Sequence, residues 1–92
     1  MFEGGSSIYT ATRKAYPRLW RIWYRINQRC KNNELYYEDV KVSDNYNIDI
    51  SGEQGFLNFV EDFADTHQED LTIDRIDPKG HYEFSNMRWA DR

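Results

Sequence analysis

The fifteen residues from Pro17 to Lys31 constrain the fold more than any other segment of this chain. Apolar side chains recur there at helical spacing and form one stripe, and proline suits the first position of a helix. The stripe consists of Leu19, Ile22, Trp23, Ile26 and Cys30, flanked by Trp20 and Tyr24. A separate face carries Arg18, Arg21, Arg25 and Arg29. The pattern therefore predicts a helix with one face in the core and one arginine face.

The length and composition bound the class of protein. A chain of 92 residues is expected to form one domain, over 1–92, with a single core. Aromatic residues make up 16% of it, which favours order over disorder. Cys30 is the one cysteine, so an internal disulfide is excluded. We see neither a signal peptide nor a run of about 18 apolar residues, and expect an intracellular protein without a membrane span.

The charge is divided unevenly along the chain. Residues 1–31 hold seven basic and one acidic residue, whereas residues 32–92 hold five basic and fifteen acidic residues. Such a division suggests a basic face that could meet phosphate and an acidic face that could repel or imitate it. The alternative is that both faces are solvated and partly neutralise each other.

The first residues and the middle of the chain have less regular patterns. Residues 1–7 read as a flexible arm. The alternation of Val40 with Val42, and of Ile48 with Ile50, predicts short strands. Residues 51–54 have the form of a capping box and open a second helix that ends near Ala64. The acids expected on its exposed face are Glu53, Glu61, Asp62 and Asp65.

Residues 71–92 predict a compact ββα module. Leu71 to Ile76 reads as a strand, Asp77 to Gly80 as a type I turn, and His81 to Phe84 as the return strand. Ser85 would then cap a terminal helix that contains Asn86 and Trp89. The fold class we expect is α+β, with two helices packed beside this module.

The segment LTIDRIDPKGHYEFSNMRWAD, residues 71–91, resembles the core of the HNH superfamily, and is most similar to small phage and prophage HNH-like proteins. The upstream LWRIWYRINQRCKNN is similar to the helix that precedes the motif in such proteins. The resemblance implies a hairpin and helix that hold one divalent metal, Mg²⁺ or Mn²⁺. By position, Asp74 matches the carboxylate that anchors the metal and Asn86 the structural asparagine.

The resemblance also indicates that the catalytic parts are incomplete. Arg75 occupies the position of the catalytic histidine, and an arginine stays protonated, so it cannot act as the ordinary general base but could hold a phosphate. In homing-type relatives the last metal ligand lies two or three helical turns beyond the structural asparagine, whereas this sequence ends at Arg92. His81 is the one nearby imidazole that could replace the missing base.

Several of these residues also have purely structural interpretations. Asp74 and Asp77 could cap the turn and pair with Arg75 or Arg88 instead of binding metal. His81 could be a plain surface residue. We expect Trp89 in the core and His67 in solvent. The arginine face could track a nucleic-acid backbone or simply be solvated.

Three functions follow, in order of preference. The first is a noncatalytic phage or mobile-element protein on a degenerate HNH-like scaffold. It would act in the host cytoplasm, without a cofactor, and inhibit a nucleic-acid enzyme such as a host defence nuclease. The second is a metal-dependent endonuclease or nickase that uses Asp74 and His81. The third is a noncatalytic DNA-binding protein that uses the arginine face.

Overall fold

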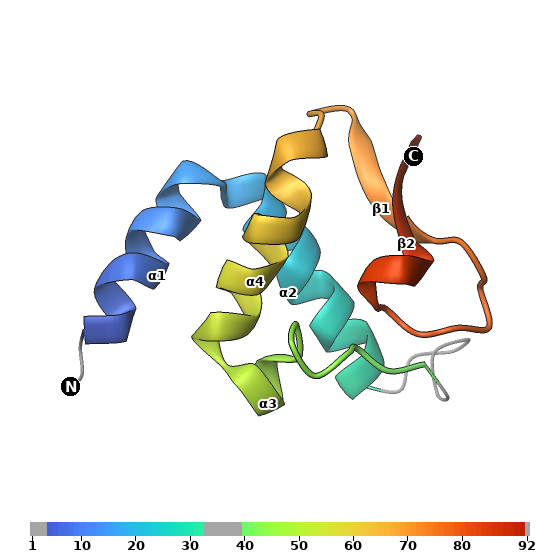
Figure 1. The fold of residues 1–92 in the computed structure, drawn as a ribbon, viewed down its shortest axis with the longest axis horizontal. Coiled ribbons are helices and arrows are strands. Elements are labelled where there is room, and N and C mark those ends of the chain that lie inside the picture. Colours follow the sequence, from blue (N-terminus) through green and yellow to red (C-terminus); the bar gives the residue numbers. More distant parts are fainter. Residues whose placement is uncertain (1–3, 33–39, 92) are drawn as a thin grey trace.

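The computed structural model describes residues 4–32 and 40–91, which form an α+β domain of helices and one antiparallel pair of strands. The elements are α1 (Gly4–Ala15), α2 (Pro17–Lys31), α3 (Ile48–Ser51), α4 (Glu53–Phe63), the 3-10 helix η1 (Ala64–Thr66), β1 (Leu71–Arg75), the 3-10 helix η2 (Phe84–Asn86) and β2 (Met87–Asp91). Helix α1 and the ribbon of β1 and β2 lie on opposite sides of the α2–α4 pair (Figure 1). None of the helices in the described ranges is long and apolar enough to cross a membrane.

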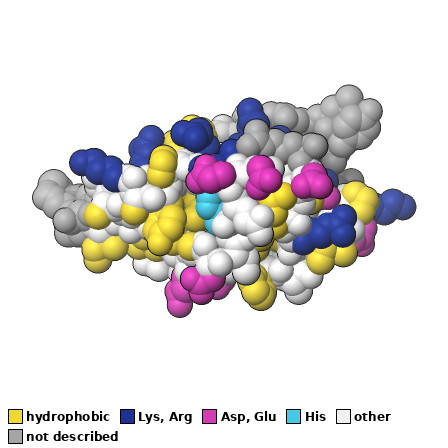
Figure 2. Space-filling view, turned by 90° about the horizontal axis from the view of Figure 1, so that it is seen from above, with side chains coloured by type: hydrophobic (Ala, Val, Ile, Leu, Met, Phe, Trp, Pro, Cys, Tyr) yellow, Lys and Arg dark blue, Asp and Glu magenta, His cyan; other side chains and the backbone are white. Residues whose placement is uncertain are grey.

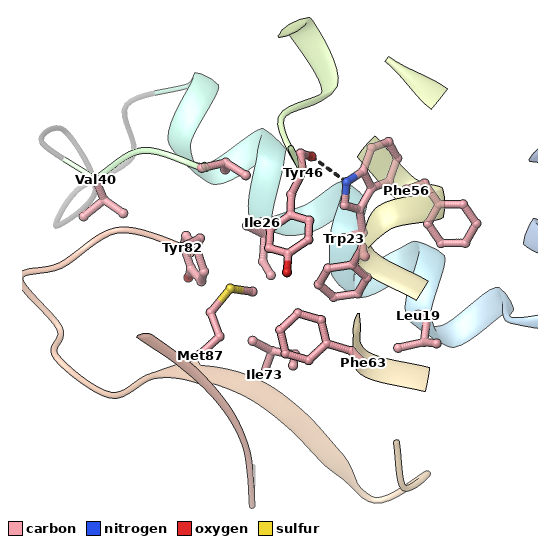
Figure 3. Packing of buried hydrophobic residues seen from close by; sticks show 12 residues of the cluster. Leu19, Trp23, Ile26, Val40, Tyr46, Phe56, Phe63, Ile73, Tyr82 and Met87 are labelled. Carbon is pink, nitrogen blue, oxygen red and sulfur yellow. Dashed lines mark hydrogen bonds between the residues drawn. The ribbon is translucent and has the colours of Figure 1, made fainter. Parts of the chain in front are cut away.

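The helix expected over Pro17–Lys31 is confirmed, and its apolar stripe enters the core as predicted. Leu19, Trp23 and Ile26 are buried, and they meet Phe56, Phe59 and Phe63 of α4. The core is completed by Val40, Val42, Tyr46, Ile73, Tyr82 and Met87 (Figure 3). Aromatic rings supply much of the buried area, and this allows a short chain to form one continuous core.

The expectation of a flexible arm over residues 1–7 is wrong for Gly4 to Ser7, which belong to α1; residues 1–3 lie outside the described part. Tertiary contacts of α1 explain the difference. The Tyr9 ring meets Phe56 edge-on at 5.8 Å between centroids, and its hydroxyl accepts a hydrogen bond from Trp20 Nε1 at 2.7 Å. Packing of this kind stabilises a helix whose first residues have poor helix propensity.

Residues 46–48 are attached to α2 by two buried side chains, Trp23 and Asn27. The backbone oxygen of Tyr46 accepts hydrogen bonds from Trp23 Nε1 at 2.7 Å (Figure 3) and from Asn27 Nδ2 at 3.2 Å. Asn27 Oδ1 accepts a third from the backbone nitrogen of Ile48, at 2.8 Å. These bonds satisfy backbone groups that would otherwise be buried without partners, so they fix the path of the chain across α2.

Two expectations for residues 48–54 are wrong. Ile48 and Ile50 lie in the short helix α3, because the Asn47 side chain caps its N-terminus by accepting from the backbone nitrogens of Asp49 and Ile50. No capping box forms, since the Ser51 hydroxyl donates to the Asp44 carbonyl instead. Helix α4 begins directly after Gly52, its N-cap residue. The φ of Gly52 is 59°, which glycine adopts without strain.

The expected ββα module is also corrected. Strand β1 and the turn at Asp77–Gly80 form as predicted, with Gly80 N donating to Asp77 O at 2.9 Å. However, the partner of β1 is Met87–Asp91 in antiparallel register, where a terminal helix was expected. The alternation of buried Met87 with exposed Arg88 suits a strand that has one face on the core. The expected return strand near Tyr82 forms only an isolated parallel bridge to Val42.

We expect Asn27→Ala to lower the free energy of unfolding by about 1 to 3 kcal/mol, because it removes a buried donor to the Tyr46 oxygen and the acceptor of the part-buried Ile48 nitrogen. Denaturant unfolding measures this change. Asn58→Ala is the matched control, since Asn58 Nδ2 also donates to a backbone oxygen, that of Asn45 at 2.8 Å, but in an exposed position. Equal losses in the two variants would contradict the role assigned to Asn27.

Candidate nucleic-acid interface

The arginine face of α2 lines a groove of about 800 Å³ beside β1. Its lining includes all four arginines that the helical spacing placed together. The groove residues are Arg18, Trp20, Arg21, Ile22, Tyr24, Arg25, Ile26, Gln28, Arg29, Thr72 and Ile73. The structure therefore brings the arginine face, the flanking aromatics and one strand to the same surface.

The four arginines differ in how tightly the fold holds them. Arg18 is half-buried, and its Nη2 donates to the Leu71 carbonyl oxygen at 2.6 Å, which ties α2 to the start of β1. Arg29 is also half-buried, whereas Arg21 and Arg25 are exposed. Arg18 thus shapes the groove, and Arg21 and Arg25 offer their guanidinium groups to solvent and to any ligand.

The aromatic residues of the groove form an ordered stack. Trp20 and Tyr24 lie nearly parallel, with 4.9 Å between ring centroids and 13° between planes. The guanidinium carbon of Arg13, from α1, lies 3.7 Å from the Trp20 ring centroid. Arg13 is not among the predicted site residues, although the excess of basic residues over 1–31, which includes Arg13 and Lys14, was an available signal.

The expected acidic residues lie on α4 and just beyond it, and all four of them are exposed: Glu53, Glu61, Asp62 and Asp65. Figure 2 shows Lys and Arg side chains along one edge of the molecule and a row of Asp and Glu side chains beside them. Asp62 also has a structural task, because it accepts a hydrogen bond from the Tyr46 hydroxyl. Burial raises the pKa of Tyr46, and the hydrogen bond to Asp62 raises it further.

Charged side chains of residues 71–91 contact other groups of the same segment. Asp74 faces Arg88 across the two strands, with 3.6 Å between charged atoms, and both side chains are exposed. Asp77 Oδ1 accepts from the Lys79 backbone nitrogen at 2.9 Å. Arg75 Nη1 donates to the carbonyl oxygens of Pro78 and Gly80, at 2.6 and 2.9 Å. Arg75 therefore holds the turn together from inside.

Asn86 ties the two ends of the same loop. Its Oδ1 accepts from the Asp77 nitrogen at 2.8 Å, while its Nδ2 donates to the carbonyls of Asp77 and His81 at 3.1 and 3.0 Å. A Cβ atom on Gly80 would lie 2.7 Å from Asn86 Nδ2, so only glycine leaves room for this amide. The Asn86 side chain therefore bridges the two ends of this loop.

Both histidines contact other parts of the chain. Exposed His81 accepts a hydrogen bond at Nδ1 from the Lys41 backbone nitrogen, 3.0 Å away, which places the proton of the neutral ring on Nε2. His67, expected in solvent, instead packs on Trp89 with 5.1 Å between centroids, and its Nε2 is buried. Trp89 is half-buried against the core and donates to the Thr66 hydroxyl at 2.7 Å.

Asp74 and His81 are not joined into a metal centre. Within residues 4–32 and 40–91, the structure has no group of three or more His, Cys, Asp or Glu side chains that could hold an ion. Asp74 is paired with Arg88, and His81 is bonded to the 41–43 segment through Lys41. Instead, Arg75 and Asn86 cross-link the loop between β1 and β2. Strand β1, which precedes this loop, lines the arginine groove.

Comparison with known proteins adds no assignment: no family model matches the chain, and neither a curated protein nor a solved structure matches it.

We expect Asn86→Ala to lower the free energy of unfolding by about 1 to 2 kcal/mol, because three hydrogen bonds across the loop are removed together. Denaturant unfolding would measure this loss. Gly80→Ala should also destabilise the parent, since the new methyl group would meet the Asn86 amide.

A double-mutant cycle tests whether the two effects share this packing. The cost of Gly80→Ala should fall in the Asn86→Ala background, where the amide is absent. Strict additivity of the two changes would contradict the packing described for this loop.

Proposed function

We propose that the protein is a noncatalytic nucleic-acid-binding module whose ligand lies in the groove between α2 and β1. The observation that carries the proposal is the convergence of four arginines with Trp20 and Tyr24 on one concave surface. Guanidinium groups bind phosphate through two parallel hydrogen bonds, and aromatic rings bind bases, so both parts of a nucleotide have a partner here.

The location of the basic residues supports binding in the groove and not attraction by the net charge of the protein. The chain as a whole carries a net charge of −4, so diffuse attraction to nucleic acid is not expected. The basic residues are instead concentrated before residue 32, and the exposed Arg21 and Arg25 lie one helical turn apart on the groove. A local cluster of this kind can bind a polyanion although the protein as a whole is acidic.

The HNH-like segment supports a scaffold role in this proposal. The guanidinium of Arg75 donates to two carbonyl groups of the turn, and Asp74 is paired with Arg88. Under this interpretation the segment supplies β1, which forms one wall of the groove. We propose no hydrolytic step, because Arg75 stands where a general base would be needed.

We expect Arg21→Glu combined with Arg25→Glu to weaken binding of fluorescein-labelled DNA by at least tenfold at low salt. The slope of log K against log salt should fall in magnitude by about 0.7 to 0.9 for each phosphate that the variant no longer neutralises. Fluorescence anisotropy over a series of salt concentrations measures both quantities.

Lys41→Glu combined with Lys79→Glu is the charge-matched control, because both residues lie on loops outside the groove lining. This control changes the net charge equally and should keep most of the affinity. Equal losses in the two double variants would show only a net-charge effect and would reject the groove.

A second candidate function rests on the exposed acids of α4 and η1. A phage or mobile-element protein could present Glu53, Glu61 and Asp65 to the basic groove of a host nucleic-acid enzyme and so inhibit it. None of these acids lines the arginine groove, so the two candidates are separable by mutation.

Under the second candidate, Glu61→Lys combined with Asp65→Lys should relieve inhibition of plasmid cleavage by an RNA-guided defence nuclease of a bacterial host. Asp62 is left unchanged because it also bonds to Tyr46. The control Glu83→Lys with Asp91→Lys changes the charge equally at other exposed sites and should leave inhibition intact. Absence of inhibition by the parent protein across such nucleases would reject this candidate.

The same assay without the nuclease tests for cleavage by the protein itself, in Mg²⁺ or Mn²⁺. Cleavage that disappears in both Asp74→Ala and His81→Ala would overturn the noncatalytic proposal in favour of an HNH-type endonuclease.

A further inference from the structure

We infer that the groove selects single-stranded over duplex nucleic acid, with a base stacked on Tyr24 and the adjoining phosphates on Arg21 and Arg25. This inference rests on the nucleic-acid binding proposed above and names the class of ligand. It is carried by the aromatic stack and by the elements that flank the arginine face.

The stack holds the Tyr24 ring in place before any ligand arrives. Trp20 is fixed by its hydrogen bond to the Tyr9 hydroxyl and by the Arg13 guanidinium over its ring. Tyr24 lies parallel to Trp20 and keeps 39% of its surface exposed. A ring that is already ordered loses little conformational freedom on binding, so it is a favourable platform for a base.

The arginines have the right sequence spacing to act with this ring. Tyr24 follows Arg21 by three residues, and Arg25 follows Arg21 by four. Side chains three and four residues apart on a helix are surface neighbours, with about 5 to 6 Å between Cβ atoms. A base on Tyr24 would therefore have the phosphates on either side of it within reach of the two exposed guanidinium groups.

The flanking elements disfavour a duplex. A helix that reads duplex DNA must enter a major groove about 12 Å wide. Here β1 adjoins the arginine face, because Arg18 bonds to Leu71, and α1 adjoins the aromatic side, because Arg13 covers Trp20. The arginine face thus forms part of a recess, where a helix cannot protrude into a duplex. Bases of a duplex are also stacked inside it and would have to be unpaired to reach Tyr24.

The test compares a fluorescein-labelled strand of about 16 nucleotides, alone and annealed to its complement, by anisotropy at one salt concentration. We expect the parent to bind the single strand more tightly. Tyr24→Ala should weaken single-strand binding by about 5- to 100-fold, whereas Tyr24→Phe should retain it, because stacking needs the ring and not the hydroxyl. Binding should also quench tryptophan fluorescence in the parent and less so in Tyr24→Ala.

Tyr16→Ala is the matched control, since Tyr16 is 40% exposed and lies outside the groove lining. It should leave both affinities unchanged, and thermal unfolding of each variant checks that it remains folded. Equal or tighter binding of the duplex, or an unaltered affinity in folded Tyr24→Ala, would overturn the inference while leaving nucleic-acid binding in place. Binding of neither probe by the parent would instead reject the proposed function itself.

Discussion

The backbone oxygen of Tyr46 is the point on which the described structure depends, because Trp23 and Asn27 both donate to it from α2. These bonds bring the chain between α2 and α4 close to α2 and place the Tyr46 ring in the core. Helix α4 then packs on the same backbone so closely that a Cβ on Gly55 would lie 2.9 Å from that oxygen. A buried carbonyl with two donors is costly to disrupt, so these bonds fix the relative position of α2 and α4.

The groove is a consequence of that packing. Because the apolar stripe of α2 is held against α4 and Tyr46, its arginine face is directed to the remaining side, where β1 lies. Arg18 then sets the distance between α2 and β1 by bonding to Leu71. One helix is thus divided into a core face and an arginine face, and under the proposed function the second face binds the ligand without a separate binding domain.

Residues 71–91 use several of their polar side chains to hold the loop between β1 and β2 together. Arg75 and Asn86 are held by carbonyl and amide groups of the loop between β1 and β2, and Asp74 is held by Arg88. The half-buried Arg75 and Asn86 already have protein partners, so they gain little from a ligand. Under the proposed function the segment therefore builds one wall of the groove, and binding specificity comes from α2.

Sequence alone determined the elements whose hydrophobic period is long and regular, since α2, α4 and β1 bury one face each and periodicity reports burial. It also placed the four arginines together, because positions on one helix follow from spacing. Tertiary structure decided what depends on a distant partner. Met87–Asp91 is a strand because β1 pairs with it, and Gly4–Ser7 are helical because α1 packs on α2 and α4. Helix α3 begins where the Ile48 nitrogen bonds to Asn27 of α2. Short segments have little intrinsic preference, so the contacts they make across the fold choose their conformation.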